Sequence, residues 1–216
     1  FNMSGKIRGI ASPMKTPDIS IDFSSKDSYV KSEDLPFPLN SLSISGSYTN
    51  GSMNSIETSS IIIENFNTDF MNSNLRGNFI ITNLTEPTFK VNIAGKIVLS
   101  DLNFISEDYN IGFTKGTLIP DISATGKIKY LPGEKTSIEL LPAGRMRVNQ
   151  AAIEMHHFPL LVHSISSVLN TSNYKINGSI EGMLGKSDIQ AELSVSNILQ
   201  YFKKETPISV TGNISS

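Results

Sequence analysis

The sequence contains no cysteine among its 216 residues. Disulfides and thiolate metal sites are therefore excluded, and the fold must be held together by packing alone. The 18 Lys and Arg residues are spread thinly along the chain and are balanced by 20 Asp and Glu residues, which leaves a formal net charge of -2. Such a chain has no basic stripe to neutralise a phosphate backbone, so nucleic acid is not an expected partner.

Long hydrophobic runs are also missing. No apolar stretch approaches the roughly 20 residues that span a bilayer, and the first residues, FNMS, do not have the pattern of a signal peptide. Because Gly5, Lys6 and Ile7 already resemble the start of a strand, we expect the sequence to be a piece of a larger protein. Residues 1–216 are interpreted as a single β-repeat region with two candidate sub-repeats, 1–105 and 106–216.

What the chain does contain is apolar and polar residues in alternation. Ile19, Ile21 and Phe23 are separated by Ser20 and Asp22, a two-residue period that gives a strand one apolar and one polar face. The same period recurs in residues 42–48, 89–93, 127–130, 145–149 and 189–195. No long 3.6-residue period interrupts it, which predicts an all-β fold: an antiparallel meander of repeated amphipathic strands.

Glycine and asparagine punctuate these runs. Residues 49–51 (TNG), 132–133 (PG) and 177–178 (NG) are predicted to form hairpin turns. A triplet of glycine, a polar residue and an apolar residue is interpreted as a strand opener, and it begins at Gly5, Gly77, Gly95, Gly126, Gly144 and Gly178. The spacing of about 50 residues between Gly77, Gly126 and Gly178 lies within the range of repeat architectures.

Three segments depart from the strand period. Residues 100–105 and 196–202 place Ser with Asp or Asn ahead of apolar residues three or four apart, which predicts single capped helical turns. Residues 151–170 could form a helix with proline near its first turn, but their β-branched and serine content favours a strand. We therefore predict one or two short helical turns in an otherwise all-strand chain.

No group of residues has a spacing typical of catalysis or metal binding. Residues 185–187 (GKS) resemble the end of a phosphate-binding loop, but Ile180 stands where the loop needs its first glycine. His156, His157 and His163 have no cysteine or carboxylate at a spacing that completes a metal site. The sequence therefore predicts a protein that is not an enzyme, with no catalytic residue, no metal site and no cofactor.

The apolar faces of the predicted strands must be covered. A closed β-sandwich does this with a second sheet, and the residue pattern alone favours it. A curved, groove-like sheet would instead offer a floor for acyl chains, which need continuous apolar surface and no directed hydrogen bonds. The residues predicted to line this lipid groove are Ile21, Phe23, Phe79, Ile81, Phe89, Val91, Ile93, Ile138, Leu140, Leu193 and Val195.

Two blocks of sequence carry a resemblance to a known family. The first comprises residues 38–51 (PLNSLSISGSYTNG), 63–66 (IENF), 77–84 (GNFIITNL) with Pro87, and 95–102 (GKIVLSDL). The second comprises residues 158–159 (FP), 180–189 (IEGMLGKSDI), 196–199 (SNIL) and 207–215 (PISVTGNIS). In their order these blocks resemble the large AsmA-like proteins of the Gram-negative envelope, a group that includes the TamB-like proteins, and most of all the C-terminal half of that group.

The resemblance implies a parent protein anchored in the inner membrane by an N-terminal helix outside this sequence, with a long periplasmic β body. Relatives are thought to conduct phospholipids along an apolar groove toward the outer membrane, and the family has no catalytic motif. Phospholipid or another acyl-chain lipid is therefore the expected partner. Residues 151–170 fit the family pattern least well.

A second hypothesis is a structural or adhesive β-sandwich domain that binds a protein or glycan partner through its loops. The two hypotheses differ in the apolar face. A sandwich has two inner faces that seal each other, whereas a groove leaves apolar surface that no second sheet covers.

Overall fold

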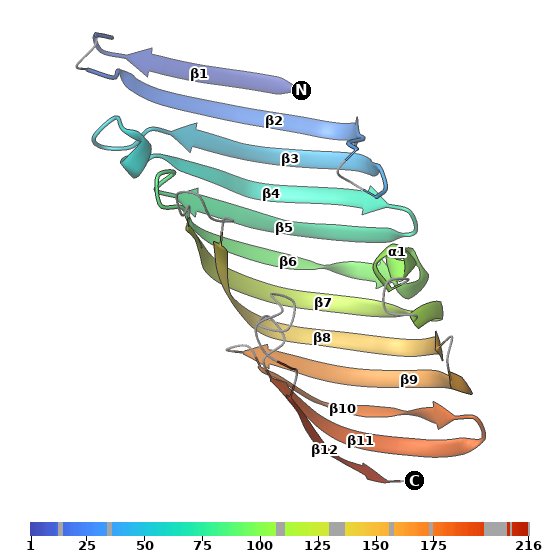
Figure 1. Ribbon diagram of the computed structural model, residues 1–216. Helices are drawn as coiled ribbons and strands as arrows, with labels where there is room; N and C mark the ends of the chain where they lie inside the picture. The colour runs from blue at the N-terminus through green and yellow to red at the C-terminus, as the bar shows by residue number, and fades with distance from the viewer. Residues whose placement is uncertain are drawn as a thin grey trace. The chain divides into compact units, whose positions relative to one another are not determined.

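The computed structural model of the chain describes residues 1–12, 15–33, 36–106, 111–129, 137–155, 158–172, 175–196, 207 and 209–215. Twelve strands lie side by side in chain order in one antiparallel sheet (Figure 1). They are β1 (Asn2–Arg8), β2 (Asp18–Val30), β3 (Leu39–Thr49), β4 (Ser60–Phe70), β5 (Ser73–Thr82), β6 (Thr88–Val98), β7 (Ile111–Lys129), β8 (Ser137–Met155), β9 (Phe158–Ser172), β10 (Lys175–Leu184), β11 (Ser187–Ser196) and β12 (Ser209–Ser215). The sheet is open, with β1 and β12 as its edges, and this confirms the predicted meander rather than the β-sandwich.

Helical structure in the described residues is confined to short turns. The 3-10 turn η1 (Ile56–Thr58) lies between β3 and β4, and η2 (Leu99–Leu102) runs directly into α1 (Asn103–Ser106) after β6. The second of these confirms the turn predicted for residues 100–105. The turn predicted for residues 196–202 lies outside the described residues, except for Ser196, which ends β11. The described part of residues 151–170 is strand, as predicted.

The chain forms two compact units. Unit 1 comprises Phe1–Phe70, Asn74–Ile93 and Ser123–Leu141, and unit 2 comprises Met71–Ser73, Ala94–Ile122 and Pro142–Ser216. In unit 1 the buried Phe70 ring stacks on Phe37, with ring centroids 4.6 Å apart. In unit 2 a buried cluster of Leu99, Ala151 and Ile165 is surrounded by Leu102, Phe113, Leu118, Val148, Ile153, Val162 and Ile180.

Cross-strand pairing sorts the side chains of each unit onto two chemically different faces, because directly opposed residues in an antiparallel pair lie on the same side of the sheet. In unit 1, Met3 pairs with Phe23, and Ile7 with Ile19. In unit 2, Ile176 pairs with Val195, which pairs with Val210. We call this side of each unit its apolar face. The opposite, polar face carries pairs such as Ser4 with Asp22, Lys6 with Ser20, Asn177 with Ser194 and Ser194 with Thr211.

A β-bulge in β8 adds one residue to the strand and keeps the apolar residues on both sides of it on the apolar face. Val148 pairs with Ser167, but the next described pair joins Ala151 to Ile165, so β8 holds one extra residue in this interval. Gln150, inside the interval, has a φ of 52°, in the left-handed region typical of one bulge class. The bulge places both Val148 and Ala151 toward the buried cluster of unit 2.

Two predictions about glycine are wrong. The pair at residues 177–178 is not a hairpin turn but lies in the middle of β10. The glycines interpreted as strand openers all lie within strands as well. The hairpin between β10 and β11 instead turns at Gly185 and Lys186, where Gly185 has a φ of 62°. The predicted turn at residues 49–51 does leave β3, whereas residues 132–133 lie outside the described residues.

Asn50, just beyond β3, ties the start of β2 into the sheet of unit 1. Its side chain is buried, with 3% exposure. Its Oδ1 accepts a hydrogen bond from the Ile19 backbone N–H at 2.8 Å, and its Nδ2 donates to the Pro17 carbonyl at 2.7 Å. The Thr58 hydroxyl, in turn, donates to the Asn50 carbonyl at 2.7 Å. The carboxamide therefore continues the backbone ladder past the end of the strand.

We expect Asn50→Ala to destabilise the chain by about 1–3 kcal/mol, because the backbone groups of Ile19 and Pro17, both half-buried, lose their partner. Urea unfolding followed by circular dichroism measures the change. Asn65→Ala is the matched control: Asn65 is exposed on β4, and its loss should change stability by less than about 0.5 kcal/mol. Equal effects of the two substitutions would contradict the role of Asn50.

Candidate functional site

The first part of the candidate site is the apolar face of unit 1. Ile21 pairs with Gly5 on one side and Tyr48 on the other, and Phe23 pairs with Met3 and Gly46. Ile21 and Phe23 are half-buried, but the row remains open toward β1, where Met3 is 68% and Ile7 72% exposed.

Two side-chain hydrogen bonds define the faces of β5 and β6. Asn92 Nδ2 donates to Asn78 Oδ1 at 2.7 Å, and the Thr82 and Thr88 hydroxyls lie 2.8 Å apart. These four residues therefore share the polar face. The alternate positions, which lie on the apolar face, are five of the predicted groove residues: Phe79, Ile81, Phe89, Val91 and Ile93. The rings of Phe79 and Phe89 lie 6.1 Å apart between centroids, and all five side chains are half-buried.

The remaining predicted groove residues lie on β8 and β11. Lys129 of β7 forms an ion pair with Glu139, which places Ile138 and Leu140 on the side opposite to this pair. Ile138 is 49% exposed, and Leu140 is half-buried. In unit 2, Leu193 lies between Gly178 and Gly212, and Val195 lies between Ile176 and Val210. The structure thus brings nine predicted residues together on the apolar face of unit 1 and two on that of unit 2.

Few hydrophobic side chains are sealed from solvent. Among the described residues the buried hydrophobic ones are Phe70, Leu99, Ala124, Ala151, Ala152 and Ile165. Large apolar residues are exposed on both edge strands, with Val210 at 60% and Ile214 at 74% on β12. A sandwich of this length would bury both inner faces, so this distribution is typical of a single layer.

One part of the apolar face of unit 2 is covered by the chain itself. Leu99, which follows β6, contacts the cluster formed by Ala151 of β8 and Ile165 of β9. Since β7 lies between β6 and β8, Leu99 reaches this cluster only across the face of the sheet. We call residues 99–104 the cap, because Leu99 and Leu102 close the apolar face at this point.

Buried polar contacts fix the cap. Asp101 is 2% exposed and accepts hydrogen bonds from the Ser73 hydroxyl at 2.7 Å, the Asn72 backbone N–H at 2.8 Å and Asn72 Nδ2 at 3.0 Å. Burial raises the pKa of the Asp101 carboxyl, but the bonds from Ser73 and Asn72 outweigh burial and hold that pKa below its ordinary value. Asn103 bonds the Phe113 backbone through both its amide atoms, at 2.8 and 3.1 Å.

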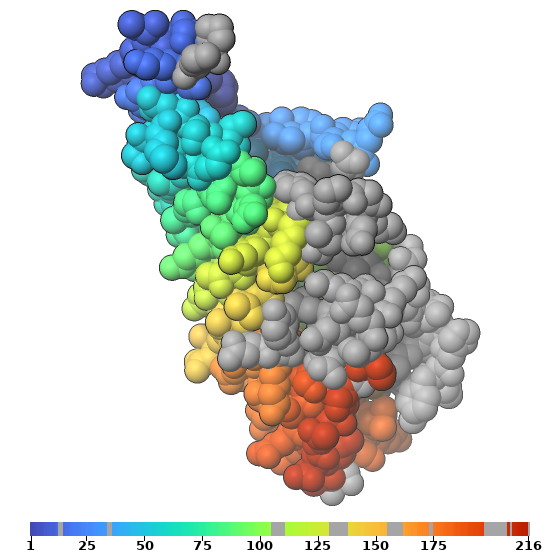
Figure 2. Space-filling model, turned by 60° about the vertical axis from the view of Figure 1, so that its left-hand side comes forward, coloured from blue at the N-terminus to red at the C-terminus, as the bar shows by residue number. Residues whose placement is uncertain are grey.

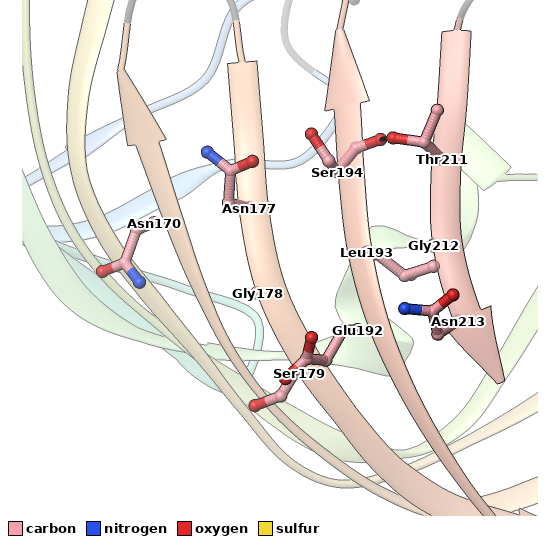
Figure 3. Close-up of a pocket in the computed structure, with 10 residues that line it drawn as sticks. All are labelled: Asn170, Asn177, Gly178, Ser179, Glu192, Leu193, Ser194, Thr211, Gly212 and Asn213. Atoms are coloured by element: carbon pink, nitrogen blue, oxygen red, sulfur yellow. Dashed lines mark hydrogen bonds between the residues drawn. The ribbon is translucent and has the colours of Figure 1, made fainter. Parts of the chain in front are cut away.

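A hollow of about 720 Å³ lies on the polar face of β9 to β12 (Figure 3). Its polar side chains are Asn170, Asn177, Ser179, Glu192, Ser194, Thr211 and Asn213. They provide amides, hydroxyls and one carboxylate, and none of the described residues that line the hollow is Lys or Arg. A smaller hollow of about 350 Å³ in unit 1 has the same chemistry, with Ser4, Asp22, Ser24, Ser45 and Glu64. Sequence reasoning missed both hollows, because alternation shows which residues are polar but not where their face is concave.

The histidines that the sequence analysis considered as metal ligands are only partly within the described residues. On β9, His163 Nε2 lies 3.1 Å from the Gly185 carbonyl oxygen, and His163 Nδ1 lies 3.1 Å from the Ser164 hydroxyl oxygen. His156 and His157 lie outside the described residues. Across the described ranges, no three His, Cys, Asp or Glu side chains group closely enough to hold a metal ion. No helix in that part of the chain is long and apolar enough to cross a membrane.

Comparison of the chain with protein-family models, with curated proteins and with solved structures finds no match. The structure therefore describes the protein by its fold alone. In its described residues this fold is a single-layer antiparallel meander with one apolar and one polar face in each unit.

Asp101→Asn tests the attachment of the cap. We expect a loss of about 2 kcal/mol in unfolding free energy at pH 7, because the amide presents a donor to groups that donate to the carboxylate. A carboxyl whose pKa is lowered on folding stabilises the fold above its ordinary pKa, and that contribution disappears as the pH falls through the folded value. The difference between wild type and variant should therefore shrink below a pH of about 3.8. A difference that does not depend on pH would contradict this assignment.

Proposed function

We propose that the chain is the periplasmic part of an AsmA-like envelope protein that binds phospholipid acyl chains on its apolar face and conducts them between the inner and outer membranes. The observation that carries the proposal is the extent of apolar surface on a single-layer sheet. Val91, Ile93 and Phe89 lie on this face and are half-buried by their neighbours within the sheet.

Acyl chains suit such a surface energetically. Each buried methylene contributes about 0.8 kcal/mol, and no hydrogen bond or charge needs to be matched along the chain. On β5 and β6, the residues next to Asn78 and Asn92 that lie on the apolar face are aromatic or aliphatic: Phe79, Ile81, Phe89, Val91 and Ile93. On this proposal, lipid is held by partitioning, and the protein needs no reactive group.

The proposed setting follows from the resemblance of the two sequence blocks to the AsmA-like family. It places this chain in the periplasm of a Gram-negative bacterium, within a parent protein anchored in the inner membrane.

A second candidate function, binding of a glycan, is favoured by the polar hollow on β9 to β12. Amides, hydroxyls and a carboxylate are groups that hydrogen-bond sugar hydroxyls, and they lie on the face opposite to the proposed lipid surface. The two candidates therefore predict ligands on opposite faces.

A charge placed on the apolar face should remove lipid. The chain is purified gently from bacteria, and bound phospholipid is measured by native mass spectrometry and lipid extraction. We expect Val91→Asp or Ile93→Asp to lower occupancy roughly tenfold or more, because a carboxylate in hydrocarbon costs about 2.5 kcal/mol or more.

Asn92→Asp is the matched control for these two variants. It adds the same charge between them but on the polar face, and the Asn78 amide can turn to donate to the new carboxylate. Its lipid content should equal that of the wild type. Wild-type protein without lipid, or equal lipid in folded Val91→Asp and Asn92→Asp proteins, would refute the proposal.

Photo-crosslinking locates the ligand without removing it. A benzophenone amino acid in place of Phe89 should crosslink to phospholipid in cells, whereas the same group in place of Lys90, exposed on the polar face, should not. Lipid adducts are detected by mass spectrometry after digestion. Phospholipid crosslinks from position 90 and none from position 89 would place the lipid on the polar face and contradict the proposal.

A further inference from the structure

The cap, residues 99–104, lies on the apolar face of unit 2 as an added piece of chain and not as a member of the sheet. The strands beneath it, β8 and β9, pair directly with each other. The cap is held by side chains instead, through the hydrogen bonds of Asp101 and Asn103. The backbone ladder of β8 and β9 therefore does not depend on the cap.

The surface beneath the cap is hydrophobic, and the cap covers it with two aliphatic side chains. Leu99 is 5% exposed and lies against Ala151 and Ile165. Leu102 packs against the same cluster, as do Ile153 of β8 and Val162 of β9, which pair with each other. This part of the apolar face thus accepts branched hydrocarbon groups, which bind through apolar area and need no directed hydrogen bond.

The covered surface continues into the uncovered apolar face of unit 2. A single cross-strand row consists of Val148, Ser167, Ile180, Ala191 and Ile214. Val148 and Ile180 pack against the cap cluster. Ile214, at the far end of the row, is 74% exposed on β12, whose red atoms lie at the surface in Figure 2. A ligand on the open part of this face would reach the covered part only by displacing the cap leucines.

We infer that Leu99 and Leu102 occupy an acyl-chain subsite on the apolar face of unit 2, so that the cap and an acyl chain compete for it. The cap is then an autoinhibitory contact that ends the lipid surface at this point. The inference rests on the proposed function, since it takes the acyl chain as the ligand of the apolar face. A peptide or a glycan suits the subsite less well, because its polar groups would lose water against the hydrophobic cluster.

The attachment of the cap is separate from the subsite. Asp101 bonds to Ser73 and Asn72, and Asn103 bonds to the Phe113 backbone. Neither Asp101 nor Asn103 belongs to the hydrophobic cluster. A substitution at Asp101 therefore loosens the cap and leaves the leucines and the floor beneath them unchanged, whereas substitution of the leucines empties the subsite directly.

Photo-crosslinking at position 162 tests for the subsite. The full chain carries a benzophenone amino acid in place of Val162, and the purified protein is incubated with palmitate as the acyl-chain probe. With the cap unaltered we expect little palmitate adduct at this position. The double variant Leu99→Ala and Leu102→Ala should raise the adduct roughly fivefold or more, because the space of two leucine side chains opens above the floor.

Leu118→Ala is the matched control for the double variant. It removes a leucine from the same cluster, but that leucine belongs to β7 and the cap stays in place. Its adduct at position 162 should change less than about twofold. An equal rise in Leu118→Ala would show that any loss of packing admits palmitate, and would overturn the inference.

Asp101→Asn provides a reading that keeps both cap leucines. It should raise the adduct at position 162 about twofold or more, and palmitate should speed hydrogen exchange in residues 99–104 of this variant. No rise at position 162 in folded double variant and folded Asp101→Asn protein would overturn the inference. If the double variant does not fold, Asp101→Asn alone decides between these results.

A benzophenone at position 89 in unit 1 separates this inference from the proposed function. Palmitate adduct at position 89, without any rise at position 162 in the cap variants, would overturn the competition and leave lipid binding on the apolar face of unit 1 in place. No adduct at position 89 would contradict the proposed function, and this inference with it.

Discussion

Cross-strand register is the constraint on which the chemistry of this chain depends. In a sheet one layer thick, each side chain belongs to one of two faces, and a slip of one residue would exchange them all. Pairs such as Ile21 with Tyr48 and Asp22 with Ser47 keep apolar and polar groups on separate sides of the same backbone. The bulge in β8 preserves this separation, because Val148 and Ala151 on either side of it both contact the buried cluster of unit 2.

Polar side chains at strand ends hold this register in place. Asn50 and Asn103 each use both amide atoms to satisfy backbone groups beyond a ladder, and Asp101 gathers three donors from the β4–β5 turn. Such groups stabilise the fold because they are satisfied, and a partner lost from any of them leaves a buried group unpaired. Through Asp101 and Asn103 they also position the cap, which decides where the apolar face of unit 2 is closed.

The two-residue period was sufficient to predict the meander and the face of each proposed groove residue, since alternation is what a half-buried strand requires. It could not predict the bulge at Gln150, because the change of phase from Val148 to Ala151 depends on the pairing partner in β9. The Asn-Gly signal failed at residues 177–178 for a related reason. Inside β10, position 178 must be glycine because a Cβ there would lie 2.8 Å from Leu169 Cδ2. Leu169 lies on β9, and the two residues become neighbours only in the folded sheet.

Among the described residues few hydrophobic side chains are buried, so the stability of this part of the sheet rests on backbone pairing and on contacts within the layer. Any molecule that binds the apolar face of the folded chain, and not the unfolded chain, must therefore stabilise the fold by mass action. On the proposal that acyl chains occupy this face, lipid is cargo and also covers apolar side chains over which the described residues place no second sheet. The glycines and their covering side chains fit this view, because Phe23, Phe66 and Phe89 fill the space above their glycine neighbours with apolar atoms. On the same proposal, such a surface would hold hydrocarbon by area rather than by shape, which would suit a ligand that moves along the sheet.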